Sequence, residues 1–586
     1  MNLKWGLGET NLLMYSVVDK VLQEAMAFYK TGQIDETERI CQEILHSDPD
    51  SVDALHLLGV VAYQVGKYDV AVDLIAQAIE IDSGQAIFFN SLGLGLKEQL
   101  RLEEAVEAYH RALEINPDYS EACNNLGTVF YQQSRFLEAV EAYQRSVRIN
   151  PRYCEAYNNL GLLFQEQENF DQAIEAYRCA LEINPDYSEA CNNLGTVLQR
   201  QEDFDQAIVL YRHAVTINPK YCEAYNNLGL LFQEQGRLKE GIEAYKCALK
   251  IHPQFANAHS NLAKTLFLQG DFRNAWKEYE WRWECRGISF SLNKRHFPQP
   301  LWDGSNLSRR TILVWAEQGI GDEIMFSSML PNLLKMNPNV IVECDKRLVP
   351  LFQRSFLNVQ FVPREDPTNP KLLDTTIIDY QIPMGSLGQW LRVDEDAFLP
   401  KQESYLQACP NKTRQMQKKY RELADDKLLV GISWKSTGID KKRAHTKNVP
   451  LKYWIPILSR QDCYFISLQY GDIREDIEEH TSAFGSPIYI DEEIDSLENL
   501  DDFAAQVSAL DLIISTSNAT VHVAGGLGKR VWVLLSSRPD WRWMLDRDDS
   551  PWYQTVRLFR QEKLGDLKRM LQRVNFALGK DCRFCN

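Results

Sequence analysis

The sequence predicts an α-helical solenoid in the first half of the chain and an α/β fold of two Rossmann-like lobes in the second half. Prolines and Leu-Gly pairs recur every 34 residues through the first half, which is typical of stacked helical units. Beyond residue 310, short apolar segments with the length of strands alternate with helical segments, which favours parallel sheets. At 586 residues the chain is too long for one hydrophobic core, so we expect about two to four domains.

Composition and charge argue against several classes of partner. The net charge of −17 disfavours nucleic acid or an anionic membrane as the main partner, because both carry negative charge. No apolar run reaches the roughly 18 residues of a transmembrane helix, and the first residues lack the basic start and apolar core of a secretory signal. The 13 cysteines follow the helical repeats rather than a disulfide framework. We therefore expect a cytoplasmic protein with no membrane span.

Two cysteines at the end of the chain form a separate CxxC pair. Cys582 and Cys585 have the spacing of metal-binding or redox pairs, but one such pair on its own is weak evidence for either role. A frayed tail is the alternative interpretation. We therefore predict no metal site.

Prolines set the register of the predicted solenoid. In each repeat a proline follows the second of two helices and ends it, because proline cannot continue an α-helix. Small residues let the two helices of a pair approach closely, and stacking of neighbouring pairs supplies the core. We predict an N-terminal tail over residues 1–17 and about eight repeats over residues 18–289. The prolines in register are Pro49, Pro117, Pro151, Pro185, Pro219 and Pro253, with Ser83 in the remaining position.

Other repeated positions indicate the type of repeat. Leu-Gly pairs such as Leu126-Gly127 keep the same 34-residue step, and a tyrosine follows most of them, as Tyr143 does here. The combination of Leu-Gly, Tyr, Ala and Pro resembles the tetratricopeptide repeat. The solenoid itself contains no catalytic constellation, which favours a role in holding a protein partner.

Asparagine recurs once per repeat, directly before the repeated leucine. Stacked repeats would align these amides as a ladder along one groove, where amides can bind an extended peptide backbone. The pattern resembles the asparagine ladder in the repeat domain of O-GlcNAc transferases. The alternative is that the amides cap or bridge neighbouring repeats, and the sequence does not separate the two hypotheses. The asparagines are Asn125, Asn159, Asn193, Asn227 and Asn261.

The second half of the chain divides into two predicted lobes that face a cleft. A polar connector over residues 290–310 leads to a first lobe over residues 311–409. A linker over residues 410–427 separates it from a second lobe over residues 428–586. The predicted strands are residues 311–315, 339–344, 359–363, 376–383, 428–434, 464–468, 511–515 and 531–535, with helices over residues 348–356 and 501–510.

One stretch of the first lobe has the form of a ligand site. The strand over residues 311–315 is followed by Gly319 and Gly321, which permit a tight turn and a close approach of the backbone. Asp322 then stands where a helix would begin. Many α/β domains build a crevice at the ends of their strands in this way.

Two segments of the second lobe suit a phosphate group. In the basic loop after the strand over residues 428–434, we assign Lys435, Arg443 and Lys447 to phosphate binding and Lys441 and Lys442 to the solvated surface. The other segment is a turn leading into a helix, whose backbone N–H groups and dipole favour an anion without a metal. The predicted cradle residues are Ser517, Asn518, Ala519 and Thr520, followed by His522, which either hydrogen-bonds the ligand or is purely structural.

The ordered set of motifs is similar to glycosyltransferase family nine, the heptosyltransferase-like group with the GT-B fold. With the solenoid in front, the chain resembles the bacterial tetratricopeptide-repeat glycosyltransferases over nearly its whole length. The motifs are Gln318-Gly-Ile-Gly-Asp322, Gly431-Ile-Ser-Trp-Lys435 and the stretch from Ser515 through His522 to Lys529, with Pro300-Leu-Trp-Asp-Gly304 and Pro539-Asp-Trp-Arg-Trp543 in support.

The resemblance implies transfer of a sugar from a nucleotide-sugar donor, with inversion and without a bound metal or cofactor. Asp322 matches the family's aspartate that serves as base, with Glu323 as the fallback, whereas capping of a helix is the alternative role for Asp322. In GT-B folds a terminal helix, here over residues 563–577, often packs back across to the first lobe. The chain departs from the heptosyltransferases at residues 517–519, where they have Asp-Thr-Gly or a close variant and this chain has Ser-Asn-Ala. This departure leaves the donor sugar open.

Two classes of function follow from these predictions. The first is a glycosyltransferase whose solenoid recruits a protein acceptor, with a lipid-linked saccharide as an alternative acceptor. The second is an adaptor whose solenoid binds partners and whose second half is a degenerate, non-catalytic GT-B pair, an interpretation that the missing carboxylate favours. Binding of a nucleoside diphosphate separates the two classes, because a ligand of the native state must raise its melting temperature.

Overall fold

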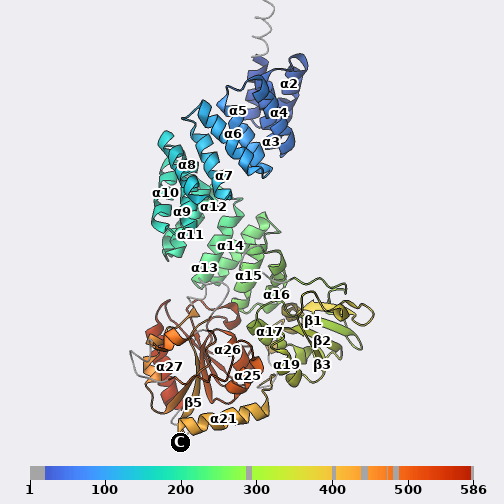
Figure 1. Ribbon diagram of the computed structural model, residues 1–586, viewed down its shortest axis with the longest axis vertical. Coiled ribbons are helices and arrows are strands. Elements are labelled where there is room, and N and C mark those ends of the chain that lie inside the picture. Colours follow the sequence, from blue (N-terminus) through green and yellow to red (C-terminus); the bar gives the residue numbers. More distant parts are fainter. Residues whose placement is uncertain are drawn as a thin grey trace, which may run out of the picture. The chain divides into compact units, whose positions relative to one another are not determined.

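The computed structural model describes residues 20–285, 294–398, 404–436, 447–471, 473–478 and 488–581. The chain separates into two compact units, residues 1–224 and residues 225–586, and Figure 1 labels their elements. The predicted tail over residues 1–17 and the pair Cys582 and Cys585 lie outside the described residues.

Antiparallel helix pairs make up the first unit, as the 34-residue period predicts. In a representative repeat, α7 (Ser120–Gln132) packs against α8 (Phe136–Ile149). A Cβ atom at Gly127 would stand 2.8 Å from the ring of Tyr143, so the Leu-Gly position leaves room for the tyrosine of the next helix. Ala139 on α8 is fully buried. The repeated small residues therefore set how closely each pair packs.

The repeats continue from the first unit into the second. The second helix of a repeat ends two residues before the repeat proline, as at Ile149 and Pro151, which is where the sequence places the stop. The helices are α2 (Ile34–Ser47), α3 (Val52–Gln64), α4 (Tyr68–Ile81), α5 (Ala86–Glu98), α6 (Leu102–Ile115), α7, α8, α9 (Cys154–Glu166), α10 (Phe170–Ile183), α11 (Ser188–Arg200), α12 (Phe204–Ile217), α13 (Cys222–Glu234), α14 (Leu238–Ile251), α15 (Ala256–Gln269) and α16 (Phe272–Tyr279), followed by the 3-10 helix η1 (Glu280–Glu284).

Two parallel sheets form the rest of the second unit. The first sheet, in the first lobe (residues 294–398), has the strand order β3-β2-β1-β4. The second sheet, in the second lobe (residues 404–581), has the order β6-β5-β7-β8-β9. The central strands of both sheets are buried along almost their whole length, as expected for parallel strands covered on both faces. A helical solenoid followed by α/β lobes is therefore confirmed as the fold class.

Register and bounds follow the predicted pattern closely. In the first sheet β1 pairs with β2 from Thr311↔Asn339 to Trp315↔Glu343, and in the second β5 pairs with β7 from Val430↔Leu512 to Ser433↔Ser515. The strands are β1 (Thr311–Trp315), β2 (Asn339–Cys344), β3 (Val359–Pro363), β4 (Tyr380–Pro383), β5 (Leu428–Ser433), β6 (Cys463–Ser467), β7 (Leu512–Thr516), β8 (Val531–Leu535) and β9 (Val556–Arg560). The helices are α17 (Ile320–Ser327), α18 (Leu330–Leu334), α19 (Val349–Ser355), α20 (Gly388–Leu391), α21 (Pro410–Ala424), α23 (Ile455–Leu458), α25 (Leu500–Ser508), α26 (Ala519–Gly526) and α27 (Leu567–Asp581), with 3-10 helices η3 (Pro370–Leu373), η4 (Met384–Leu387), η5 (Asp396–Phe398), η6 (Leu451–Tyr453) and η7 (Trp541–Trp543).

Two strands differ from the prediction. The strand predicted over residues 376–383 begins only at Tyr380, because the N–H groups of Ile377 and Ile378 donate to the Asp374 carbonyl oxygen in a turn. Strand β9 is absent from the predicted strands. It is a short edge strand with an arginine at positions 557 and 560, which weakens the apolar signal of a buried strand.

Two helical segments also differ. The predicted linker over residues 410–427 contains the 15-residue helix α21, which is anchored where the buried Tyr420 hydroxyl donates to Asp491 Oδ2 at 2.6 Å. The terminal helix is predicted to cross to the first lobe. Instead, the buried face of α27, including Leu571 and Val574, joins the core of the second sheet.

Aromatic side chains join the last repeat to both lobes. Phe267 of α15 stacks on Trp541 of η7 in the second lobe, with ring centroids 4.4 Å apart. Trp276 of α16 is fully buried, and its Nε1 donates to the Arg392 carbonyl oxygen of the first lobe at 2.8 Å. The division between the compact units accordingly falls inside the repeats, at residues 224 and 225, and not at the connector near residue 290.

Candidate functional site

A cleft of about 440 Å³ lies between the ends of the two sheets. On the first lobe it is bounded by the turn between β1 and α17, and on the second by the turn between β7 and α26. The helices α17 and α26 pack against each other (Figure 1). The predicted residues that line the cleft are Gly319, Gly321, Asp322, Lys447, Ser517, Asn518, Ala519, Thr520 and His522.

The two helices meet at Gly321 and His522. A Cβ atom at Gly321 would stand 2.9 Å from His522 Cδ2, so this glycine is needed for the close approach of the lobes. His522 is buried, its Nδ1 lies 2.7 Å from the Tyr553 hydroxyl, and its ring stacks on Trp543. Burial, with a further contribution from nearby Arg542, lowers the pKa of His522 to about 3. The imidazole is therefore neutral around pH 7 and serves as a hydrogen-bonding group rather than a charge.

The turn before α26 is built around Asn518. Its Oδ1 accepts from the Thr520 N–H at 3.0 Å and from Ser515 Oγ at 3.1 Å, and its Nδ2 donates to Ser433 Oγ at 2.7 Å. Asn518 thus fixes the start of the helix against β5. The Thr520 hydroxyl is buried in the cleft wall without a hydrogen-bond partner among the described residues. This hydroxyl group therefore has one hydrogen-bond donor without a partner among these residues.

Asp322 forms an ion pair with Arg542 of η7, across the cleft in the other lobe. Arg542 also pairs with Asp540, Nη1 to Oδ1, at 2.5 Å. Although burial opposes its ionisation, Arg542 and Lys447 hold the pKa of Asp540 well below its usual range. Asp322 lies in the first turn of α17, and the N-cap position of that helix is Gly319. Asp322 is therefore not the N-cap residue.

The basic loop after β5 is divided between the cleft and its surroundings. Lys447 lines the cleft, with its Nζ 4.0 Å from Asp540 Oδ2. Lys435 follows β5 as predicted but is not among the residues that line the cleft, and its ammonium pairs with Asp476. Arg443, like Lys441 and Lys442, lies outside the described residues.

Glu323, the fallback base, points away from the cleft. Its side chain is 1% exposed and forms an ion pair with Arg364 at 3.0 Å, while its Oε2 accepts from the Asp345 N–H at 2.9 Å. Burial raises the pKa of Glu323 to about 7 against the opposing effect of Arg364. These contacts tie α17 to the end of β2, which is a structural role.

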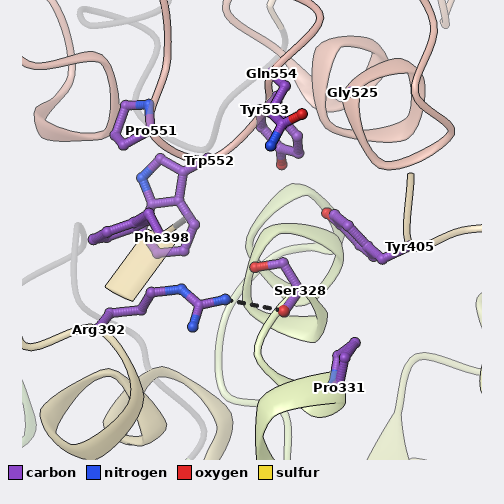
Figure 2. A pocket seen from close by; sticks show the side chains of 10 residues that line it. All are labelled: Ser328, Pro331, Arg392, Phe398, Tyr405, Gly525, Pro551, Trp552, Tyr553 and Gln554. Atoms are coloured by element: carbon purple, nitrogen blue, oxygen red, sulfur yellow. Dashed lines mark hydrogen bonds between the residues drawn. The ribbon is translucent and has the colours of Figure 1, made fainter. Parts of the chain in front are cut away.

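A second, smaller pocket of about 40 Å³ is lined by Tyr553, Tyr405 and Arg392 among other residues (Figure 2). Tyr553 lines this pocket and contacts His522, which lines the cleft. Arg392 lies at the pocket's edge, where its Nη2 donates to the Ser328 carbonyl oxygen at 3.0 Å, the bond drawn in Figure 2. Its buried guanidinium therefore binds the backbone at the end of α17 and does not pair with a carboxylate among the described residues.

The repeated asparagines bridge neighbouring repeats. The Asn125 amide donates to Asn90 at 3.0 Å, and the Asn159 amide donates to Asn124 at 2.9 Å. The same bond joins Asn193 to Asn158 at 3.0 Å and, in the second unit, Asn261 to Asn226 at 3.1 Å. These four asparagines and Asn227 are half-buried. Bridging was one of the two alternatives for the ladder, and a role in binding an acceptor stays a prediction.

Three charged residues of the cleft are missing from the sequence-based site: Arg347, Asp540 and Arg542. Arg542 and Asp540 belong to the motif Pro539-Asp-Trp-Arg-Trp543, so their sequence signal is visible although it gives them no role. Arg347 follows β2 and is held by Asp345, with Nε to Oδ1 at 2.9 Å. Its sequence context offers no comparable signal.

Neither a metal-binding cluster nor a membrane-spanning helix is found in the described part of the chain. There, no group of three or more His, Cys, Asp or Glu side chains is placed to hold a metal ion. No helix in that part combines the length and the apolar composition needed to cross a membrane.

Comparison with known proteins supports the repeats. Residues 22–86, 96–168 and 152–254 match models of the tetratricopeptide repeat. Protein FlbA of Caulobacter vibrioides is 31% identical over 324 residues, which cover 53% of this chain and 53% of FlbA, so the chain spans about half the length of this curated relative. Among solved structures, the APC/C hetero-tetramer Cut9-Hcn1 has 18% identity and a TM-score of 0.38, covering 47% of this chain and 53% of that one. YrrB, a TPR protein, has 22% identity and a TM-score of 0.27, covering 31% and 95%. The solenoid therefore contains tetratricopeptide repeats over residues 22–86 and 96–254.

Proposed function

We propose that the protein is a glycosyltransferase that uses a nucleotide-sugar donor and whose repeats recruit a protein acceptor. The observation that carries the proposal is the cleft, where Asp322 of the first lobe faces the turn before α26 of the second. Such a carboxylate can take the proton from an acceptor hydroxyl group. Backbone N–H groups and cations on the opposite wall can offset the charge that grows on the leaving diphosphate.

Each side of the cleft has a distinct part in this reaction. Asp322 is the proposed base, and the reaction is inverting and independent of metal. Residues 517–520 and Lys447 are proposed to hold the diphosphate, with the free Thr520 hydroxyl as one donor. The neutral His522 orients a ligand oxygen through a hydrogen bond. The half-buried asparagine amides of the repeats are proposed to contact the backbone of the acceptor protein.

Nucleotide release tests this proposal. Purified protein is incubated with a panel of UDP-, GDP-, ADP-, CDP- and dTDP-sugars and a cell extract as the source of acceptor, and free nucleotide is measured. We expect release with one donor class, loss of release in Asp322→Asn, and retained binding of the nucleoside diphosphate by that variant. Asp303→Asn, on an exposed loop, is the matched control and should leave release unchanged. Wild-type protein that binds no nucleoside diphosphate would favour the adaptor instead.

A further inference from the structure

Every cation that lines the described part of the cleft already has a carboxylate partner. Arg347 is held by Asp345, Lys447 lies near Asp540, and Arg542 contacts both Asp540 and Asp322. A diphosphate entering this cleft would meet two carboxylates as well as the cations. Its binding therefore requires at least one of these pairs to change partner.

Arg542 is the cation best placed to change partner. Its Nη1 is held by Asp540, a neighbour in the same loop, and its Nη2 reaches across the cleft to Asp322. Its Nε is buried and has no hydrogen-bond partner among the described residues. The guanidinium lies over the ring of Trp541, with Cζ 4.7 Å from the ring centroid. Asp540 and Trp541 can keep Arg542 in place while its Nη2 leaves Asp322 and binds another anion.

We propose that Arg542 exchanges Asp322 for the diphosphate of the donor when the donor binds. This inference rests on the proposed function and deepens it. Without a ligand, the Arg542 guanidinium neutralises Asp322 and occupies its carboxylate. A diphosphate offers two or more oxygens to the planar guanidinium, a stronger match than one carboxylate oxygen. The exchange frees the Asp322 carboxylate, so the base becomes available only after the donor has bound.

The exchange predicts a different result from the alternative in which Arg542 permanently joins the two lobes. In the unliganded protein Asp322 competes with the diphosphate for Arg542. Removing the charge of Asp322 therefore removes the competitor and makes diphosphate binding tighter. If Arg542 instead holds the lobes together permanently, loss of Asp322 opens the cleft and makes binding weaker or leaves it unchanged.

Calorimetric titration of the full chain distinguishes these outcomes. The ligands are inorganic pyrophosphate and the nucleoside diphosphates UDP, GDP, ADP, CDP and dTDP. We expect Asp322→Asn to bind at least about threefold more tightly than the wild type, and Arg542→Met to bind at least about tenfold more weakly. In the double variant the gain from Asp322→Asn should vanish. Arg542→Lys should recover part of the affinity, because it keeps the charge but not the planar donor pair.

Two controls make the result specific. Arg547→Met removes an arginine of the same segment that pairs with Asp549 and Glu395 and does not line the cleft, and it should change the affinity less than about twofold. The melting temperature of each variant without ligand shows whether the cleft has simply unfolded; Arg542→Lys carries the test if Arg542→Met does not fold.

The possible failures are distinct. If the wild type binds a diphosphate and Asp322→Asn binds it no more tightly, the exchange is wrong and the proposed function stands. If Arg542→Met and Arg542→Lys both bind as tightly as the wild type, Arg542 is not a ligand-binding residue. If the wild type binds none of the six ligands, the proposed function itself fails, and the exchange fails with it.

Discussion

At the scale of single residues, Gly321 decides whether the two lobes can meet. The space that its missing Cβ leaves is filled by the ring of His522 from the opposite lobe. The neighbouring Gly319 has open space around its Cβ position and a φ of −78°, which any residue can adopt. Packing between the lobes therefore requires glycine at position 321 but not at position 319.

Alanine substitutions at the two positions test this difference. Gly321→Ala forces His522 or α26 to shift, and we expect it to destabilise the second unit by about 1–3 kcal/mol and to weaken ligand binding. Gly319→Ala should leave stability within about 0.5 kcal/mol of the wild type. Chemical denaturation followed by tryptophan fluorescence measures both. Equal losses of stability in the two variants would contradict the role given to Gly321.

His522 predicts a dependence of stability on pH. Its pKa is lowered to about 3 in the folded protein and lies near 6.5 in the unfolded chain. The unfolded chain therefore takes up a proton as the pH falls below about 6.5 while folded His522 stays neutral, and stability is lost by at most about 1.4 kcal/mol per pH unit. The contribution is fully present above that pH and fades toward pH 3.

Replacing His522 by Gln removes the titration but keeps a side chain that can hydrogen-bond. We expect the drop in melting temperature between pH 7.5 and pH 5 to be smaller in His522→Gln than in the wild type. His56, whose pKa burial lowers to about 4, supplies a comparable acid dependence in the first unit and is present in both proteins. An unchanged drop would mean that His522 is protonated in the folded protein at pH 5.

At the scale of elements, hydrogen bonds between asparagine side chains join the first helix of a repeat to the first helix of the preceding repeat. Asn159 on α9 donates to Asn124 on α7, which is 6% exposed. Asn159→Ala leaves the buried oxygen of Asn124 without its donor, and we expect a cost of about 1–3 kcal/mol. Faster hydrogen exchange in α7 and α9 should report it.

The matched control removes both partners at once. The double variant Asn124→Ala/Asn159→Ala leaves no unpaired oxygen, so its cost should be clearly smaller than the sum of the two single variants. Additive costs would show that the bond between the amides contributes nothing. If Asn159→Ala lowers transfer to the acceptor under conditions where the variant is still fully folded, a direct contact of Asn159 with the acceptor is supported instead.

The sequence predicts those helices, strands and turns whose position in the fold depends on a local pattern of residue types. The 34-residue period, the strand over residues 311–315 and the glycine turn after it are visible in the sequence because each depends on residue types close together in the chain. The turn before β4 is not predictable because Ile377 and Ile378 extend the apolar pattern of the strand beyond its true start, and β9 is not predictable because Arg557 and Arg560 interrupt its apolar pattern. Helix α21 looks like a linker because its buried residues are few, with Tyr420 and Ala424 as examples.

The candidate site divides in the same way. Asp322 and the turn before α26 follow strand ends, so the position of the cleft follows from the fold. The ion pair of Asp322 with Arg542 joins residues 220 positions apart, and no local pattern specifies such a contact. Lys435 has the expected place after β5, but Asp476 draws its side chain into an ion pair that the sequence does not reveal.

At the scale of the second unit, a buried ion pair joins the last repeat to the first sheet. Arg282 of η1 is 3% exposed and Glu317, which follows β1, is 1% exposed, with Nη2 and Oε1 3.1 Å apart. Arg282 Nη2 also donates to Ser386 Oγ at 2.7 Å. Glu317 lies two residues before Gly319, so the end of the repeats is fixed directly to the turn that carries the proposed base.

Breaking this pair should be costly, whereas replacing it should not be. Arg282→Met leaves Glu317 buried without its cation, and we expect a loss of about 3–5 kcal/mol. The double variant Arg282→Met/Glu317→Met should recover most of that loss, because it leaves no fully buried charge; Glu280, the other carboxylate partner of Arg282, is 27% exposed. Denaturation midpoints of the wild type and the two variants measure it. A double variant as unstable as Arg282→Met would contradict the expectation.

The most direct test of the whole account is hydrogen exchange with and without a nucleoside diphosphate. A ligand in the cleft should slow exchange in two separate peptides, one covering residues 319–327 and the other residues 517–526, because both turns face the same space. We expect at least one of UDP, GDP, ADP, CDP and dTDP to protect both peptides together. Protection by none of them, or protection confined to segments away from these two turns, would contradict this expectation.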